Sequence, residues 1–299
     1  MAAKFTGTGV AVVTPFHIYG TIEFTSLEKI IEYVINGGVD YILVLGITSE
    51  AAALSKDEKN AITNFFIETV NKRVPVMLGV GGNNTQEVIN NIKSLSFEDI
   101  DAILSVTPYY NKPQQKGIYY HYKTIAGASP APVFLHNVPS RTSVNISAET
   151  TLRLAEDVRN IVGIKECSGD LVQIMEIIKN KPKDFLVISG HDALTLPLLS
   201  IGADGVISVI ANAFPAELSE MVNLGLKGQF NKAREKHFKL LEIINTLFED
   251  GNPSGIKAAL DILGLCKNNL RLPLVKVNKA VYNKLSTLIE EFSGLVAKK

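Results

Sequence analysis

One lysine at the end of an apolar run has the setting that covalent chemistry needs. Residues 160–164 are predicted to form a buried strand, and Lys165 follows where this strand ends. Asp170 comes after a Ser-Gly turn and is predicted to cap the next helix. An ammonium whose stem lies among Ile and Val side chains loses hydration, which lowers its pKa toward a reactive neutral amine. The stretch therefore indicates a Schiff-base lysine, and the alternative is a lysine paired with Glu166 or another carboxylate.

The remaining chain predicts the elements that would position this lysine. Apolar β-branched runs alternate with amphipathic helical patterns, which is typical of a parallel sheet covered by helices. Apart from the run that ends at Lys165, the predicted strands are residues 10–14, 41–46, 74–80, 102–106, 133–135, 185–188 and 205–209. The predicted helices between them are residues 26–35, 55–71, 85–95, 115–125, 147–155, 170–178 and 193–199, and Ser55 with Glu58 forms a capping box.

Eight such units in about 210 residues predict an α/β fold of the (β/α)8 TIM-barrel type. An open doubly wound sheet is the alternative, but the turn after the first strand reads Thr14-Pro15-Phe16 and is not glycine-rich. We expect residues 1–211 to form the barrel and residues 212–299 a C-terminal helical extension packed on it. The predicted helices of this extension are residues 216–226, 230–248, 254–263 and 279–292.

Composition narrows the class of partners. The chain has 299 residues, with 30 Lys+Arg against 30 Asp+Glu, so its formal net charge is zero. A nucleic-acid or anionic-membrane partner would favour a basic excess, so we expect neither. No apolar run reaches the about 18–20 residues of a membrane span, and the N-terminus does not resemble a signal peptide. Two cysteines form no disulfide framework, and we expect a cytoplasmic protein.

Polar residues follow the predicted strands at the end of the barrel where active sites lie. They are Thr14, residues 46–50, 81–84, 107–111 and 136–141, Lys165, residues 189–192, and Ser208 with Asn212. This places Lys165 at the centre of a pocket and favours the covalent role.

Three companions of Lys165 have candidate roles. Thr48 and nearby backbone N–H groups could hold a small carboxylate. Arg141 could bind a second carboxylate, and its alternative is a surface salt bridge. Tyr110 could relay protons or cap the pocket, and its alternative is a packing role.

Two strand-end histidines, His136 and His191, raise a rival hypothesis. Near Asp192 and Glu166 they could be ligands of a metal-dependent aldolase or hydrolase. No HxH or HExxH spacing supports this, so we predict no metal site.

Six motifs together resemble the dihydrodipicolinate synthase / N-acetylneuraminate lyase family of class I pyruvate-dependent aldolases. They are GVAVVTPF at 9–16, GVGGNNT at 79–85, VTPYYNKP at 106–113, NVPSRT at 137–142, GIKECSGD at 163–170 and GVISV at 205–209. The resemblance covers essentially the whole chain, and the VPSRT sequence points to the synthase branch.

The resemblance implies that Lys165 forms an imine with pyruvate, whose carboxylate lies on Thr48 and the adjacent backbone. The derived enamine would attack L-aspartate-4-semialdehyde held by Arg141 and give 4-hydroxy-tetrahydrodipicolinate, on the route to diaminopimelate and lysine. It also implies substrate contacts from Ile47, Gly190 and Ile207, and no cofactor beyond the covalent imine. Family members are typically homotetramers, dimers of dimers in which the residue matching Tyr110 projects into the neighbouring site.

Two residues depart from the family pattern. Ile47 replaces a threonine and His136 a tyrosine of the usual proton relay. Ile47 has no hydroxyl, and a histidine ring is shorter than a tyrosine, although it transfers protons near neutral pH. The departures leave three predicted outcomes, which are a slow synthase, an aldolase with a different aldehyde acceptor, or a pyruvate-binding homologue without activity.

The resemblance further implies an effector site for lysine. Asn83, Glu87 and Tyr109 match its usual residues, whereas Lys56 and Lys59 stand where feedback-sensitive members often have histidines. Added positive charge disfavours a cationic effector, so we predict weak or absent inhibition by lysine.

Overall fold

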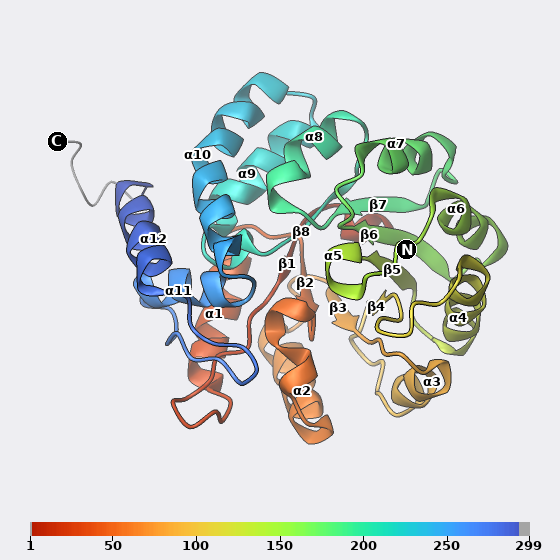
Figure 1. Cartoon of the computed structure of the whole chain (residues 1–299), viewed down its shortest axis with the longest axis horizontal. Coiled ribbons are helices and arrows are strands. Elements are labelled where there is room, and N and C mark those ends of the chain that lie inside the picture. The colour runs from red at the N-terminus through yellow and green to blue at the C-terminus, as the bar shows by residue number, and fades with distance from the viewer. Residues whose placement is uncertain (1, 293–299) are drawn as a thin grey trace.

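The computed structural model describes residues 2–292 and contains a closed barrel of eight parallel strands (Figure 1). The strands follow one another around the barrel in sequence order, which excludes the open doubly wound sheet. Their bounds are β1 Gly7–Ala11, β2 Tyr41–Val44, β3 Val76–Gly79, β4 Ala102–Val106, β5 Val133–Asn137, β6 Ile161–Glu166, β7 Leu186–Ser189 and β8 Gly205–Ser208. The predicted (β/α)8 barrel is confirmed.

Helices cover the outside of this barrel, and three more are added at its C-terminal side. Those between and after the strands are α1 Phe24–Asn36, α2 Lys56–Val70, α3 Thr85–Lys93, α4 Gln115–Ala128, α5 Pro139–Thr142, α6 Ala148–Asp157, α7 Leu171–Asn180, α8 Thr195–Ser200 and α9 Pro215–Leu226. The added ones are α10 Phe230–Glu249, α11 Ser254–Ile262 and α12 Lys279–Phe292. The capping box of Ser55 and Glu58 and the N-cap at Asp170 form as predicted, so local sequence sets where α2 and α7 begin.

Several strand boundaries differ from the sequence prediction by one to three residues, and two of them have identifiable reasons. β1 ends at Ala11 and not at residue 14, because the N–H of Val13 donates to the side chain of Asn212 instead of to a neighbouring strand. β5 continues to Asn137, two residues further than predicted, because His136 pairs with Lys165 of β6. His136 is therefore a strand residue and not the first residue of a loop.

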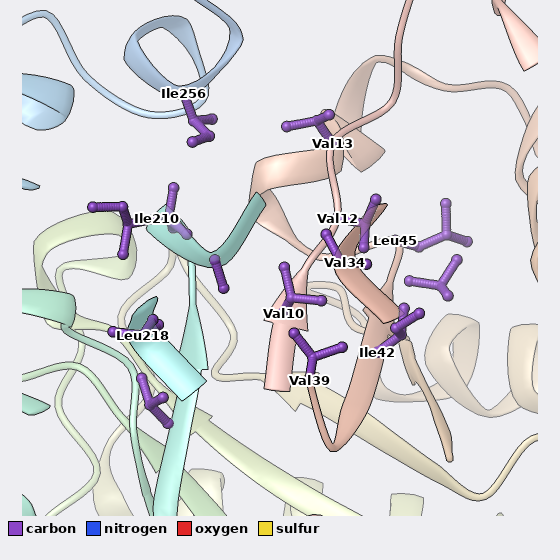
Figure 2. Close-up of a cluster of buried hydrophobic side chains, with 14 of the residues drawn as sticks. Val10, Val12, Val13, Val34, Val39, Ile42, Leu45, Ile210, Leu218 and Ile256 are labelled. Carbon is purple, nitrogen blue, oxygen red and sulfur yellow. The ribbon is translucent and has the colours of Figure 1, made fainter. Parts of the chain in front are cut away.

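Two apolar layers result from the alternation of side chains along each strand. The interior of the barrel holds residues such as Phe5, Tyr41 and Phe134, whereas a larger cluster lies between the strands and the helices. Figure 2 shows part of the larger cluster, in which Ile256 of α11 belongs with Val13 of the first strand–helix connection. The C-terminal extension thus shares one core with the barrel.

The helix α9 packs on α1, α8 and β1, so it covers the barrel as the helix that follows β8. The predicted division at residue 211 falls before this helix. The helices that lie beyond the barrel proper are α10, which packs on α9 and α8, and α11 and α12, which pack on α10 (Figure 1). None of the helices in residues 2–292 is both long and apolar enough to cross a membrane.

Candidate active site

A cavity of about 430 Å³ opens at the carboxyl ends of the strands. Six of the predicted site residues line it, namely Ile47, Thr48, His136, Arg141, Lys165 and Gly190. Its other lining residues are Val138, Ser140, Cys167, His191, Val209, Ile244, Asn245, Phe248, Glu249 and Asn252. The last five belong to α10 and the loop after it, so the helical extension closes one side of the site.

Lys165 lies inside the barrel and is only 7% exposed. The predicted alternative, an ion pair with Glu166, is not formed, because the Glu166 carboxylate accepts hydrogen bonds from Asn137 Nδ2 (3.1 Å) and from the N–H of Ser168 (2.8 Å). Within residues 2–292, no carboxylate lies within 4.0 Å of the Lys165 ammonium. A buried lysine without a counter-ion is expensive to keep, and this favours a chemical role over a structural one.

Gly190 leaves the space that Lys165 occupies. A Cβ at this position would lie 2.8 Å from Lys165 Cε and 2.1 Å from Cys167 Sγ. A side chain here would displace Cys167 or Lys165, so Gly190 leaves room for the reactive amine, whereas its predicted contact with the substrate stays a prediction.

His136 lies beside Lys165, because the two residues are register partners on β5 and β6. Side chains of paired residues in parallel strands point to the same face, which here is the barrel interior. Burial first, and the nearby Lys165 second, lower the pKa of His136 well below its usual value, so the imidazole is neutral at pH 7. Its Nε2 lies 3.5 Å from Cys167 Sγ.

Thr48 lies on the helical turn Ile47–Ser49, which follows β2. As the first residues of a turn, Ile47 and Thr48 have N–H groups without intrahelical acceptors, the arrangement that holds a carboxylate. Thr14 Oγ1 donates to Ser49 O (2.8 Å) and Asn252 Nδ2 donates to Thr48 Oγ1 (3.1 Å). The turn is thus held by one residue from the N-terminal part of the chain, Thr14, and by one from the C-terminal part, Asn252.

Arg141 extends from the short helix α5 to the cavity. Its guanidinium donates to the main-chain oxygen of Asn252 at 3.4 Å. It has no acidic partner within the described part of the chain, so the predicted alternative of a surface salt bridge is not formed. The Arg141 guanidinium is therefore available to bind an anionic ligand.

Asn252 is one of the residues of this site that the sequence analysis missed. It bridges Thr48 and Arg141, and its Oδ1 is buried without a partner. In the sequence, the Asn-Pro pair at 252–253 indicates only a turn. Its partners Thr48 and Arg141 precede it by 204 and 111 positions, and contacts between such distant residues leave no local pattern.

Two predicted site residues lie outside the cavity. Ile207 of β8 belongs to the apolar cluster inside the barrel and does not line the cavity. Val209, two residues further along the chain, lines the cavity instead. Tyr110 is 90% exposed and adopts φ 74°, a left-handed conformation that is uncommon for residues other than glycine. Within a single chain, Tyr110 therefore contributes nothing to the Lys165 pocket.

The predicted effector residues are spread over three segments. The N–H of Tyr109 donates to Asn83 Oδ1 (3.0 Å), which joins the loops after β3 and β4. Glu87 and Lys56 are exposed, and Lys59 is half-buried on α2. The effector site stays a prediction.

The metal hypothesis has no geometric basis in the described part of the chain. His136 and His191 both line the cavity, but no three His, Cys, Asp or Glu side chains of residues 2–292 converge as metal ligands. The Asp192 carboxylate instead accepts the N–H groups of Val209 and Ile210, both at 3.0 Å.

Comparison with known proteins decides the family. The sequence model of the dihydrodipicolinate synthetase family matches residues 4–292. The chain belongs to this family. The 4-hydroxy-tetrahydrodipicolinate synthase of Flavobacterium psychrophilum is 50% identical over 97% of this chain and 99% of its own length.

Solved structures of the family agree. The dihydrodipicolinate synthase of Thermotoga maritima superposes with a TM-score of 0.95 at 38% identity and covers 98% of this chain and 100% of its own. The chloride-inhibited enzyme of Acinetobacter baumannii, solved as a complex with pyruvate, has a TM-score of 0.93 at 38% identity, with 97% and 99% covered. The family resemblance of the sequence motifs is confirmed.

Proposed function

We propose that the chain is a class I lyase that condenses pyruvate with L-aspartate-4-semialdehyde to 4-hydroxy-tetrahydrodipicolinate, a step towards diaminopimelate and lysine. The observation that carries this proposal is Lys165, a buried lysine without a counter-ion at the wall of a cavity of about 430 Å³. The synthase names of the relatives and the pyruvate complex of the Acinetobacter enzyme support the assignment of both substrates.

In the proposed reaction, the amine of Lys165 attacks C2 of pyruvate and forms an imine after loss of water. The carboxylate of pyruvate lies on Thr48 Oγ1 and the N–H groups of its turn. Loss of a proton from C3 gives an enamine, and this carbon attacks the aldehyde. Cyclisation and transimination then release the product and restore the amine. No metal or further cofactor takes part.

Arg141 binds the carboxylate of the aldehyde in this proposal. Tyr110 reaches the pocket of a neighbouring subunit, which its exposed position on the loop after β4 supports. The homotetramer, a dimer of dimers, and the cytoplasmic location belong to the same proposal.

A second candidate function is an aldolase of the same family with a different aldehyde acceptor. Ile47 favours it, because this side chain is 38% exposed and lines the cavity where the relay threonine of the family stands. An apolar group there makes this part of the pocket less polar, which changes the ligands that it prefers.

Treatment with pyruvate and borohydride is expected to add one reduced pyruvyl group to Lys165 and to abolish activity. Imine reduction is specific to an amine that reacts with the ketone, so peptide mass spectrometry identifies the residue. A turnover assay over several aldehydes, including L-aspartate-4-semialdehyde, then separates the two candidate functions. The Schiff-base proposal fails if no adduct forms, or if the adduct lies on another lysine.

Millimolar L-lysine is expected to inhibit turnover weakly or not at all. Lys56 and Lys59 belong to the predicted effector site and add positive charge to it, which repels a cationic ligand. Replacement of both by histidine lowers that charge at pH 8 and is expected to increase inhibition. Strong inhibition of the unmodified protein in a lysine titration contradicts the prediction.

A further inference from the structure

A cysteine next to the pocket gives His136 a partner that the reaction proposed above does not use. Cys167 lies two residues after Lys165 and lines the same cavity. Its N–H donates to Asn137 O (2.8 Å), which holds it against β5, and its Sγ lies 3.5 Å from His136 Nε2. Gly190 makes this possible, since a Cβ there would overlap Sγ.

The two groups are both neutral near pH 7. Burial raises the pKa of the Cys167 thiol to about 12, against the opposing effect of Lys165, whereas Glu166 and Asp192 raise it further. The imidazole is neutral because its pKa is lowered. A protonated thiol can donate to an imidazole nitrogen, and the tautomer in which Nε2 accepts from the thiol carries its ring proton on Nδ1.

The other ring nitrogen is available to a ligand. Within residues 2–292, Nδ1 of His136 has no hydrogen-bond partner. Some polar atoms of the chain lack a partner because they are fully enclosed, but Nδ1 of His136 is not one of them. Nδ1 is therefore not fully enclosed, and the His136 side chain lines the same cavity as Lys165.

We propose that Cys167 and His136 form a two-membered proton relay for imine formation at Lys165, in place of the hydroxyl relay that Ile47 and His136 interrupt. Cys167 acts through His136 and is a positioning residue for the imidazole. The inference rests on the proposed function, because it assigns the proton transfers of the same reaction.

The proton balance of the relay is closed. The Lys165 nitrogen forms a bond to C2 of pyruvate, and the π pair of the carbonyl moves to its oxygen. Nδ1–H passes its proton to that oxygen while Nε2 takes the proton of the thiol. The amine nitrogen, now cationic, returns a proton to Nδ1, and Nε2–H returns its proton to the thiolate, so the carbinolamine forms with both groups restored. In a second pass, Nδ1–H protonates the carbinolamine hydroxyl, which leaves as water while Nε2 again takes the thiol proton. The nitrogen then gives its proton to Nδ1 and Nε2–H gives its proton to the thiolate, which leaves the imine and the relay in its starting state. No oxidant or further reactant is needed.

The test measures the rate at which the adduct forms separately from its final amount. Enzyme and pyruvate are mixed, quenched into borohydride at increasing times, and the adduct on Lys165 is quantified by mass spectrometry. Cys167→Ala is expected to slow its appearance about 10- to 100-fold and to leave the final yield at saturating pyruvate unchanged, since a relay alters a rate and not an equilibrium. Cys167→Ser keeps a donor and is expected to stay within a few-fold of the unmodified protein.

Cys266→Ala is the matched control, because Cys266 is the other cysteine of the chain and lies outside the cavity. An unchanged rate in Cys167→Ala overturns the relay, as does equal slowing in Cys167→Ser. If pyruvate forms the adduct but Cys167→Ala and Cys167→Ser form it at the same rate, the relay is wrong and the proposed function stands. If the unmodified protein forms no adduct, the proposed function fails and the relay with it.

A second measurement reads the tautomer in the unmodified protein. Histidine ring nitrogens give different ¹⁵N shifts in the two tautomers, and His136→Gln identifies the signal among the five histidines of the chain. A proton on Nδ1 in the unmodified protein is expected, and a proton on Nε2 overturns the relay.

Discussion

Lys165→Met is expected to lower turnover by at least about 10⁴-fold and to leave the folded state as stable as before or more stable. Methionine has nearly the same length but no amine, so no imine forms, and loss of the nucleophile in a covalent mechanism typically costs this much. The stability result follows because Lys165 is buried without a counter-ion within the described residues. Replacing an unpaired buried ammonium by an apolar group removes its desolvation cost.

Steady-state kinetics with pyruvate and the aldehyde measure the first effect, and denaturant unfolding at one fixed protein concentration measures the second. Lys116→Met, at an exposed position of α4, is the matched control and is expected to change neither. Residual turnover above about 1% in Lys165→Met contradicts the covalent mechanism. A large loss of stability would show instead that Lys165 has a structural partner.

Lys257→Met is expected to destabilise the fold by about 3–5 kcal/mol, because it leaves the Glu50 carboxylate buried without its cation. Both side chains of this pair are completely buried. Lys257 Nζ also donates to Asn269 O (2.8 Å), and Glu50 accepts the N–H of Arg271 (2.9 Å). Glu50 lies two residues after Thr48, so the pair joins α11 of the extension to the turn that holds the substrate carboxylate.

Denaturant midpoints measure the change. The matched control is Lys284→Met, which breaks the exposed pair with Glu249 (2.6 Å) and is expected to cost less than about 1 kcal/mol. The double variant Lys257→Met with Glu50→Gln removes both charges and is expected to recover part of the loss. Equal effects of Lys257→Met and Lys284→Met would refute the role of burial.

Short-range patterns in the sequence were enough to predict the barrel and its reactive lysine. Apolar runs separated by helical periodicity predict eight β–α units, and Asp170 and Ser55 with Glu58 mark helix starts, because all these signals come from neighbouring residues. The convergence of Thr48, His136, Arg141 and Lys165 on one mouth follows from the fold itself, since the strands of a parallel barrel all end on the same side.

Long-range packing decided the rest. The sequence does not show that Glu166 turns away from Lys165, that Cys167 lies against His136, or that Asn252 bridges Thr48 and Arg141. Each depends on which strand or helix lies next to which, and on the register between β5 and β6. The same applies to Ile207, whose inward direction was predictable but whose depth below the cavity was not. The sequence by itself therefore determined the fold and the nucleophile, whereas the tertiary structure decided which groups surround that nucleophile, because contacts between distant residues leave no periodic or local signal.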